Sequence, residues 1–357
     1  MTRKKMISIL LSGFMAAALT SGCGSSAGEG GPDSSVKASI NFFCWTEYMP
    51  QGVLDKFEEE TGIHVNMSTY SSNEDMLAKV KSEVEGTYDV IVPSDYMVEQ
   101  MASQGMLEEL DHKALSNLSN IGSAYLSPSY DPDNKYSVPY QGGVAAIAVN
   151  TSKVDLDITS YDDLFDPALQ RSVVALDDYR AVIGMTARSM GYSMNETDPE
   201  TLAEIEEKLM TLKENIKLYD SDSPKSALIS GDCTVGFCWG AEIALTMEED
   251  SNYKIVYPSE GAYLFMDNLA IPKGSKHYDE AMQFINFVLD PENSKMISEE
   301  FPYLNPNVEA IKLLGDDFAG NVAKNPPQEV IAMGEYVTNL DPDTIALYDE
   351  MWTKLKQ

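Results

Sequence analysis

The chain contains 357 residues, of which 57 are acidic and 25 basic, and its formal net charge is −32. This length exceeds what one compact hydrophobic core usually supports, so we expect two domains. The excess of acids argues against nucleic acid as a partner and favours solubility and the attraction of cations.

The first 22 residues have the features of a signal peptide. A basic segment, Arg3-Lys4-Lys5, precedes an apolar run over 6–19 that is too short to span a bilayer comfortably. The following Leu19-Thr20-Ser21-Gly22-Cys23 resembles a bacterial lipobox, with a chance cysteine as the alternative interpretation. We therefore expect lipidation of Cys23, a flexible tether over 23–37, and an extracytoplasmic location on the cell membrane (periplasmic where an outer membrane exists).

Strands and helices alternate after the tether. Apolar runs separated by amphipathic segments indicate an α/β unit with a mostly parallel sheet. We expect strands at 40–43, 63–67 and 89–92, and helices at 51–60, 72–86 and 97–104.

A second set of elements begins near Gly142 and Gly143, which indicate either a hinge or a bulge between strand-like runs. The same periodicities continue to the end of the chain. We expect strands at 144–149, 173–176, 234–238 and 264–271, and helices at 181–190, 199–215, 279–289 and 344–356.

Aromatic rings and acids recur where the predicted strands end. Ligands of open α/β sheets bind beyond the carboxyl ends of the strands, and rings with carboxylates suit a cation. Asp267 lies inside an apolar strand, where a carboxylate is costly unless it is paired. For single residues other interpretations stay open: Asp178 as a helix cap, Tyr96 as a core aromatic, Asp267 as a hydrogen-bonded core acid. The segments with this pattern are Trp45-Thr46-Glu47-Tyr48, Ser94-Asp95-Tyr96, Asp177-Asp178-Tyr179, Trp239 and Phe265-Met266-Asp267.

Motifs of catalysis and metal binding are absent from the sequence. It contains no Gly-x-Ser-x-Gly, no His-Glu-x-x-His and no phosphate-binding glycine loop. Neighbouring acids such as Asp177 and Asp178 do not establish the facing pair that glycoside hydrolysis needs. We therefore expect a binding protein with no enzymatic activity, no cofactor and no metal.

Several segments together resemble the spermidine/putrescine-binding proteins of ABC transporters, a group of extracytoplasmic solute-binding proteins. The resemblance extends over 40–356. It implies a type II periplasmic-binding-protein-like fold, in which two α/β lobes, each with a doubly wound, mostly parallel sheet, enclose a polyamine. The segments are Phe43-Cys44-Trp45-Thr46-Glu47-Tyr48, Tyr88-Asp89-Val90-Ile91-Val92-Pro93-Ser94, Tyr136-Ser137-Val138-Pro139-Tyr140, Phe237-Cys238-Trp239, Met266-Asp267-Asn268-Leu269-Ala270-Ile271-Pro272 and Tyr303-Leu304-Asn305-Pro306-Asn307.

The resemblance also implies a set of ligand contacts. Rings would surround the methylene chain of the polyamine, while acids and hydroxyls would hold its amines. Three positions depart from the family pattern: Phe265 stands where Trp is frequent, Ala181 where a second acid can occur, and Val337 where a glutamine occurs. The implied ligand-binding residues are Trp45, Thr46, Glu47, Tyr48, Ser94, Tyr96, Asp178, Ser221, Trp239, Phe265, Asp267 and Tyr303.

The sequence thus predicts capture of spermidine or putrescine between two closing lobes and delivery to the permease of an ABC transporter, by a monomer. We expect lobe 1 to comprise 38–141 with 266–313, and lobe 2 to comprise 142–265 with 314–357. Two alternatives stay open, a binding protein for another cationic amine or solute and a secreted hydrolase with paired acids. The preference between spermidine and putrescine does not follow from the sequence.

Overall fold

A computed structural model describes residues 38–357. The predicted signal peptide, Cys23 and the tether lie outside the described residues. Within 38–357, no helix combines the length and the hydrophobicity that a membrane crossing requires. The described residues 38–357 belong to one compact unit.

The amino-terminal part begins with the predicted α/β alternation. Three strands pair in parallel: β1 (Ala38–Trp45) lies between β2 (Ile63–Tyr70) and β3 (Val90–Ile91). Helix α1 buries Val53, Leu54 and Phe57 and ends at Gly62, whose φ of 73° suits a residue without a side chain. The connecting helices are α1 (Gln51–Thr61), α2 (Asn73–Ser82) and α3 (Asp95–Ser103).

Several boundaries differ from the sequence-based expectation, among them those of two helices. Helix α2 ends at Ser82 and not near Gly86, because Glu83 already has an extended backbone. Helix α3 begins at Asp95, directly after strand β3, so its first turn faces the carboxyl end of the sheet. The side chain of Ser72 accepts the backbone N–H of Asp75 and caps α2.

A second group of elements, over 162–256 and 342–356, also combines parallel strands with helices, and 38–103 is the first group. Strand β5 (Val173–Ala175) pairs in parallel with β6 (Ile216–Tyr219) and with β7 (Val235–Trp239), and β8 (Tyr253–Val256) pairs with β4. The helices of this group are α4 (Tyr179–Ser189), α5 (Pro199–Leu212), α6 (Lys225–Ile229), α7 (Gly240–Glu249) and the carboxyl-terminal α13 (Pro342–Lys356).

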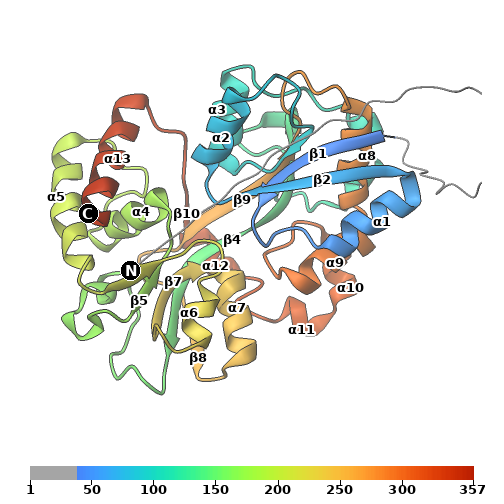
Figure 1. Cartoon of the computed structure of the whole chain (residues 1–357). Coiled ribbons are helices and arrows are strands. Elements are labelled where there is room, and N and C mark those ends of the chain that lie inside the picture. Colours follow the sequence, from blue (N-terminus) through green and yellow to red (C-terminus); the bar gives the residue numbers. More distant parts are fainter. Residues whose placement is uncertain (1–37) are drawn as a thin grey trace, which may run out of the picture. The chain divides into compact units, whose positions relative to one another are not determined.

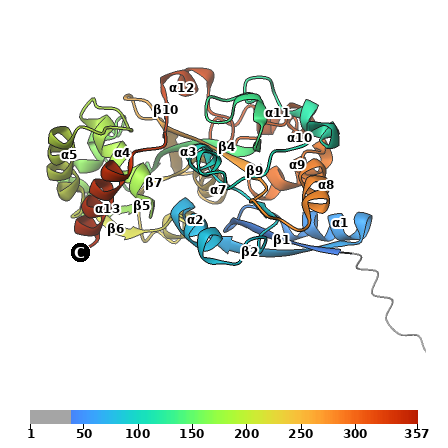
Figure 2. The same cartoon turned by 90° about the horizontal axis from the view of Figure 1, so that it is seen from above.

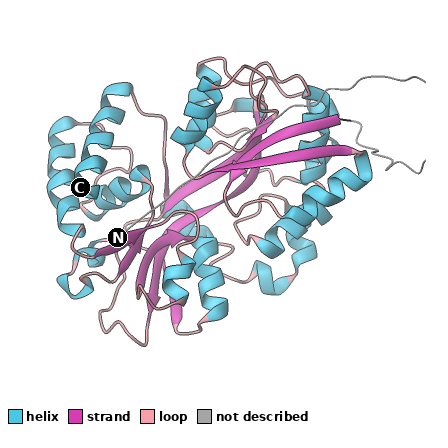
Figure 3. Cartoon of the chain, in the orientation of Figure 1, coloured by secondary structure: helices cyan, strands magenta, loops and turns pink. Residues whose placement is uncertain are grey.

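Two antiparallel strands join the groups, as Figure 1 and Figure 3 show. Strand β4 (Ser137–Asn150) and strand β9 (Tyr263–Ala270) lie in the middle of one sheet of order β2-β1-β3-β9-β4-β7-β5-β6. Gly142 and Gly143, where a hinge or a bulge is expected, lie inside the continuous strand β4, whose pairing with β9 shifts register between Pro139 and Gln141. Gly142 is required there, because a Cβ atom would lie 2.6 Å from the Met266 side chain and 2.8 Å from the Phe265 carbonyl oxygen.

The chain after β9 returns to the first group and then to the second. Helix α8 contacts β1, and α9 contacts α1 (Figure 2). Strand β10 then pairs with β9, and α13 packs on α4 and α5. These elements are α8 (Tyr278–Val288), α9 (Pro291–Glu300), α10 (Val308–Leu314), α11 (Asp316–Ala319), α12 (Gln328–Met333) and β10 (Glu335–Tyr336).

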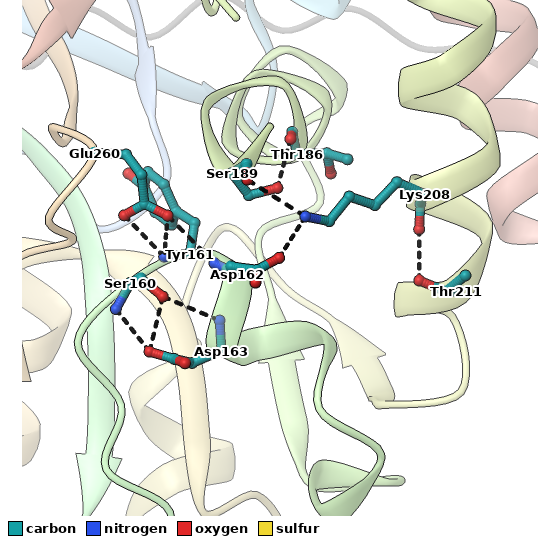
Figure 4. Close-up of polar contacts among 9 residues, drawn as sticks. All are labelled: Ser160, Tyr161, Asp162, Asp163, Thr186, Ser189, Lys208, Thr211 and Glu260. Atoms are coloured by element: carbon teal, nitrogen blue, oxygen red, sulfur yellow. Dashed lines mark hydrogen bonds and ion pairs between the residues drawn. The ribbon is translucent and has the colours of Figure 1, made fainter. Parts of the chain in front are cut away.

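A polar network fixes the loops beside α4 and α5 (Figure 4). The Glu260 carboxylate accepts the backbone N–H of Tyr161 at 3.0 Å, and the Asp163 carboxylate accepts that of Ser160 at 2.9 Å. Lys208 of α5 pairs with Asp162. The loop that precedes β9 is thereby held against the second group of helices, which places the start of β9.

Candidate ligand-binding site

A cavity of about 50 Å³ lies where the carboxyl ends of β1, β3 and β7 approach β9. Its lining includes every ligand-binding residue expected from the sequence except Glu47 and Tyr96. The lining residues are Trp45, Thr46, Tyr48, Ser71, Asn73, Ser94, Asp178, Ser221, Asp222, Trp239, Tyr263, Phe265, Asp267 and Tyr303.

Asp267 is the central acid of the cavity. Its side chain on β9 is buried, with an exposed fraction of 4%. The Ser94 hydroxyl donates to Oδ1 at 2.5 Å, and the Tyr48 hydroxyl donates to Oδ2 at 2.7 Å. Burial raises the pKa of Asp267 to about 7, although the two hydroxyl donors favour the ionised form. Within 38–357 no Lys, Arg or His side chain forms an ion pair with it, so the carboxylate can receive an external cation.

Aromatic side chains form the walls around this acid. Tyr303 stands edge-on to Tyr48, with ring centroids 4.9 Å apart, and Trp239 stands edge-on to Phe265 at 5.1 Å. The indole N–H of Trp239 donates to the Ser221 carbonyl oxygen at 3.1 Å, which fixes the ring. A chamber of rings around a buried carboxylate can hold an apolar chain that carries a positive charge.

Asp178 has two roles in the structure. Its carboxylate accepts the backbone N–H of Ala181 at 2.9 Å and caps α4, and it also lines the cavity. Burial raises its pKa, while the backbone N–H groups and the Arg180 guanidinium oppose the shift. Ala181, where the family can have a second acid, is fully buried and does not line the cavity.

The side chains of Glu47 and Tyr96 contact residues outside this cavity lining. Glu47 has a left-handed backbone with φ of 51°, and its carboxylate contacts the Lys225 ammonium at 2.5 Å. Tyr96 donates its hydroxyl to Glu74 at 3.0 Å and packs its ring against Arg180. It lines a different cavity, together with Val337 and the neighbouring acid Asp95.

The structure adds Ser71, Asn73, Asp222 and Tyr263 to the lining. Ser71 and Asn73 follow the end of β2, so the strand-end pattern could have found them had it been applied to that strand. Asn73 donates to the Ser94 hydroxyl oxygen at 3.0 Å and orients it toward Asp267. Asp222 accepts a hydrogen bond from Ser71 at 3.0 Å, across the cavity, and no sequence signal distinguished it from other loop acids.

A second, more acidic cavity adjoins the first and shares four of its lining residues, among them Asp178 and Asp222. It adds the carboxylates of Glu74, Asp75, Asp177, Asp220 and Asp349. Fixed negative charge at one side of a cleft attracts cations and raises their local concentration.

Comparison with known proteins identifies relatives along most of the chain. Residues 52–326 match the family model described as bacterial extracellular solute-binding protein. The chain is 38% identical over 319 residues, 89% of it and 91% of the relative, to the spermidine/putrescine-binding periplasmic protein of Salmonella typhimurium. It is 34% identical to spermidine/putrescine-binding periplasmic protein 1 of Haemophilus influenzae over 99% of both chains.

Solved structures show the same fold. A putative spermidine/putrescine ABC transporter protein from Listeria monocytogenes superposes with a TM-score of 0.86 at 32% identity, covering 89% of this chain and 99% of that one. The PotD substrate-binding protein of Streptococcus pneumoniae gives 0.76 at 34% identity, covering 90% and 99%. Both relatives have the two-lobed fold of periplasmic solute-binding proteins, which confirms the predicted fold class. The chain belongs to the family of bacterial extracellular solute-binding proteins.

Proposed function

We propose that this protein binds spermidine or putrescine outside the cytoplasm and delivers it to the permease of an ABC transporter. The observation that carries the proposal is Asp267, a buried carboxylate with two hydroxyl donors and no protein cation among residues 38–357, enclosed by aromatic rings. A polyamine is an apolar chain with ammonium groups, which matches this combination. The names of the relatives support the same ligand class.

In this proposal the rings pack on the methylene groups, and the acids and hydroxyls hold the amines. Asp267 takes one ammonium and Asp178 another, with Ser94, Ser221 and Thr46 as further polar contacts. No chemical step is part of the function. Trp45, Tyr48, Trp239, Phe265 and Tyr303 supply the apolar walls.

We further propose that the two lobes close around the ligand. The boundaries are those expected from the sequence, 38–141 with 266–313 and 142–265 with 314–357. Of the three crossings between these ranges, two fall inside β4 and β9, the strands that join the two groups of elements, and the third falls at the end of α10. A ligand held by residues of both lobes stabilises the closed form, which is the form expected to dock on the permease.

Calorimetric titration tests the ligand class. We expect saturable binding of putrescine and spermidine, with one molecule per chain, and no binding of 1,4-butanediol, which has the carbon chain of putrescine without its charges. Trp45 and Trp239 line the cavity, so binding should change the intrinsic fluorescence, and a Trp352→Phe variant should retain that change. Absence of polyamine binding, with another solute found bound by native mass spectrometry, contradicts the proposal.

Lipid anchoring through Cys23 is a separate proposal that rests on the sequence. When the protein is expressed with its own leader, we expect the parent in the membrane fraction and a Cys23→Ser variant in the soluble fraction, without the mass of a lipid. Two results together would contradict the anchor. The Cys23→Ser variant would remain in the membrane fraction to the same extent as the parent, and the parent would carry no lipid mass.

A further inference from the structure

Lys225 places a protein ammonium at the edge of the cavity. It begins α6, and its Nζ lies 2.5 Å from Glu47 Oε2 and 3.0 Å from Glu242 Oε2. Glu47 follows β1, whereas Glu242 is in the first turn of α7. Three separate elements therefore meet at one positive charge.

The surroundings keep this ion cluster together. The exposed fraction of the side chain is 19% for Lys225, 3% for Glu242 and 41% for Glu47, so the contact with Glu242 is removed from water and the contact with Glu47 is partly exposed. Burial alone would lower the pKa of Lys225, but Glu242 and Glu47 raise it above its ordinary value. The ammonium therefore stays charged at neutral pH, and its strongest partners are these two carboxylates.

The cluster borders the ligand cavity. Glu47 is next to Thr46, and Lys225 lies three positions beyond Asp222; both Thr46 and Asp222 are lining residues. Glu242 is on the helix that directly follows Trp239, a third lining residue. Lys225 thus pairs with Glu47, a carboxylate beside the cavity that follows the lining residue Thr46, and the positive charge of Lys225 lies next to it.

We propose that Lys225 is a specificity-determining residue that occupies Glu47 in place of a ligand ammonium and thereby favours a diamine over a triamine. This inference rests on the proposed polyamine function. A diamine can satisfy its charges at Asp267 and Asp178. The extra ammonium of a triamine, when it reaches the Glu47 side, meets a carboxylate that is already paired and a like charge beside it.

The test compares putrescine with spermidine by calorimetry in the parent and in a double variant, Lys225→Met with Glu242→Gln. The second change is needed because the loss of Lys225 alone leaves Glu242 buried without a partner. We expect the ratio of spermidine to putrescine affinity to rise by about tenfold, the effect of one partly exposed charged hydrogen bond. Glu242→Gln alone keeps the contact between Lys225 and Glu47, so it should leave the ratio close to that of the parent.

A second variant protects the test against a folding defect. Lys225→Gln together with Glu242→Gln keeps a neutral hydrogen-bonding pair and removes both charges, and the ratio should shift in the same direction. If both polyamines bind the parent and neither variant changes the ratio, the role of Lys225 is overturned while the proposed function stands. If the parent binds no polyamine, the proposed function fails and this inference fails with it.

Discussion

An Asp267→Asn variant is expected to lose about 10- to 150-fold in polyamine affinity. The substitution keeps the size of the side chain and removes the charge that would pair with a ligand ammonium. A hydrogen bond to a charged group contributes about 1.5–3 kcal/mol, which corresponds to that range. The loss should exceed that of any other single polar substitution in the cavity, because Asp267 is the buried acid of the lining and no protein cation among residues 38–357 pairs with it.

A matched control comes from Asp131. It is also a buried aspartate, and it accepts the hydroxyl of Ser137 at 2.7 Å, but it does not line the cavity. Asp131→Asn should lower the thermal stability and leave the dissociation constants for polyamines close to those of the parent. If the dissociation constants for polyamines are unchanged in Asp267→Asn, Asp267 does not pair with a ligand ammonium.

The affinity of the parent should also depend on pH. The pKa of Asp267 is raised to about 7 by burial, and only the ionised carboxylate pairs with an ammonium. The ionised fraction rises from about one-tenth to about nine-tenths between roughly pH 6 and pH 8, so the affinity should rise about tenfold. Asp267→Asn should remove this dependence.

The unliganded protein is expected to become less stable as the pH rises through neutrality, with Asp95 as the main cause above about pH 7. This carboxyl has an exposed fraction of 2% and accepts the backbone N–H groups of Tyr96 at 2.7 Å and Met266 at 3.2 Å. Burial raises the pKa of Asp95 to about 8 from an ordinary value of 3.8 for aspartate.

The sign of the effect follows from proton binding. Between about pH 4 and pH 8, Asp95 keeps its proton in the folded state and has lost it in the unfolded state, so the folded state binds more protons. The free energy of unfolding therefore falls as the pH rises through this window. From roughly pH 5.5 to pH 8 the Asp95 contribution falls by about 3 kcal/mol, of which about 1 kcal/mol falls above pH 7.

Differential scanning calorimetry of the unliganded protein measures this slope. About 1 kcal/mol corresponds to a Tm lower by roughly 2–4 °C at pH 8 than at pH 7. Asp95→Asn resembles the protonated acid, so it should remove most of that difference. Asp267 and Glu242, whose pKa values are raised to about 7, contribute mainly below neutral pH.

Asp198 provides the control for this experiment. It is exposed and caps α5, and the backbone N–H and hydroxyl of Thr201 lower its pKa. Asp198→Asn should therefore leave the decline above pH 7 in place. A Tm that does not fall between pH 7 and pH 8, or that falls equally in Asp95→Asn, would contradict the role of Asp95.

The sequence by itself determined most of the elements and most of the cavity lining. Period-2 and helical patterns place β1, α1, β7 and α13 within a few residues of their observed bounds. Trp45, Ser94, Asp178 and Trp239 follow strand ends, and parallel strands bring their carboxyl ends to one edge of the sheet. Asp267 was identifiable because a carboxylate in an apolar strand is costly without a partner.

Only the tertiary structure decided which acids near the cavity are paired with a protein cation. Glu47 and Lys225 are 178 positions apart, and their pairing depends on how β1 and α6 approach each other, which no local pattern encodes. Tyr96 is the second residue of α3 and its ring faces Arg180, so the rotation of that helix places it outside the cavity. The physical reason is the range of the forces involved: hydrophobic periodicity acts within a segment, whereas ion pairs form between whichever charged groups the packed elements bring together.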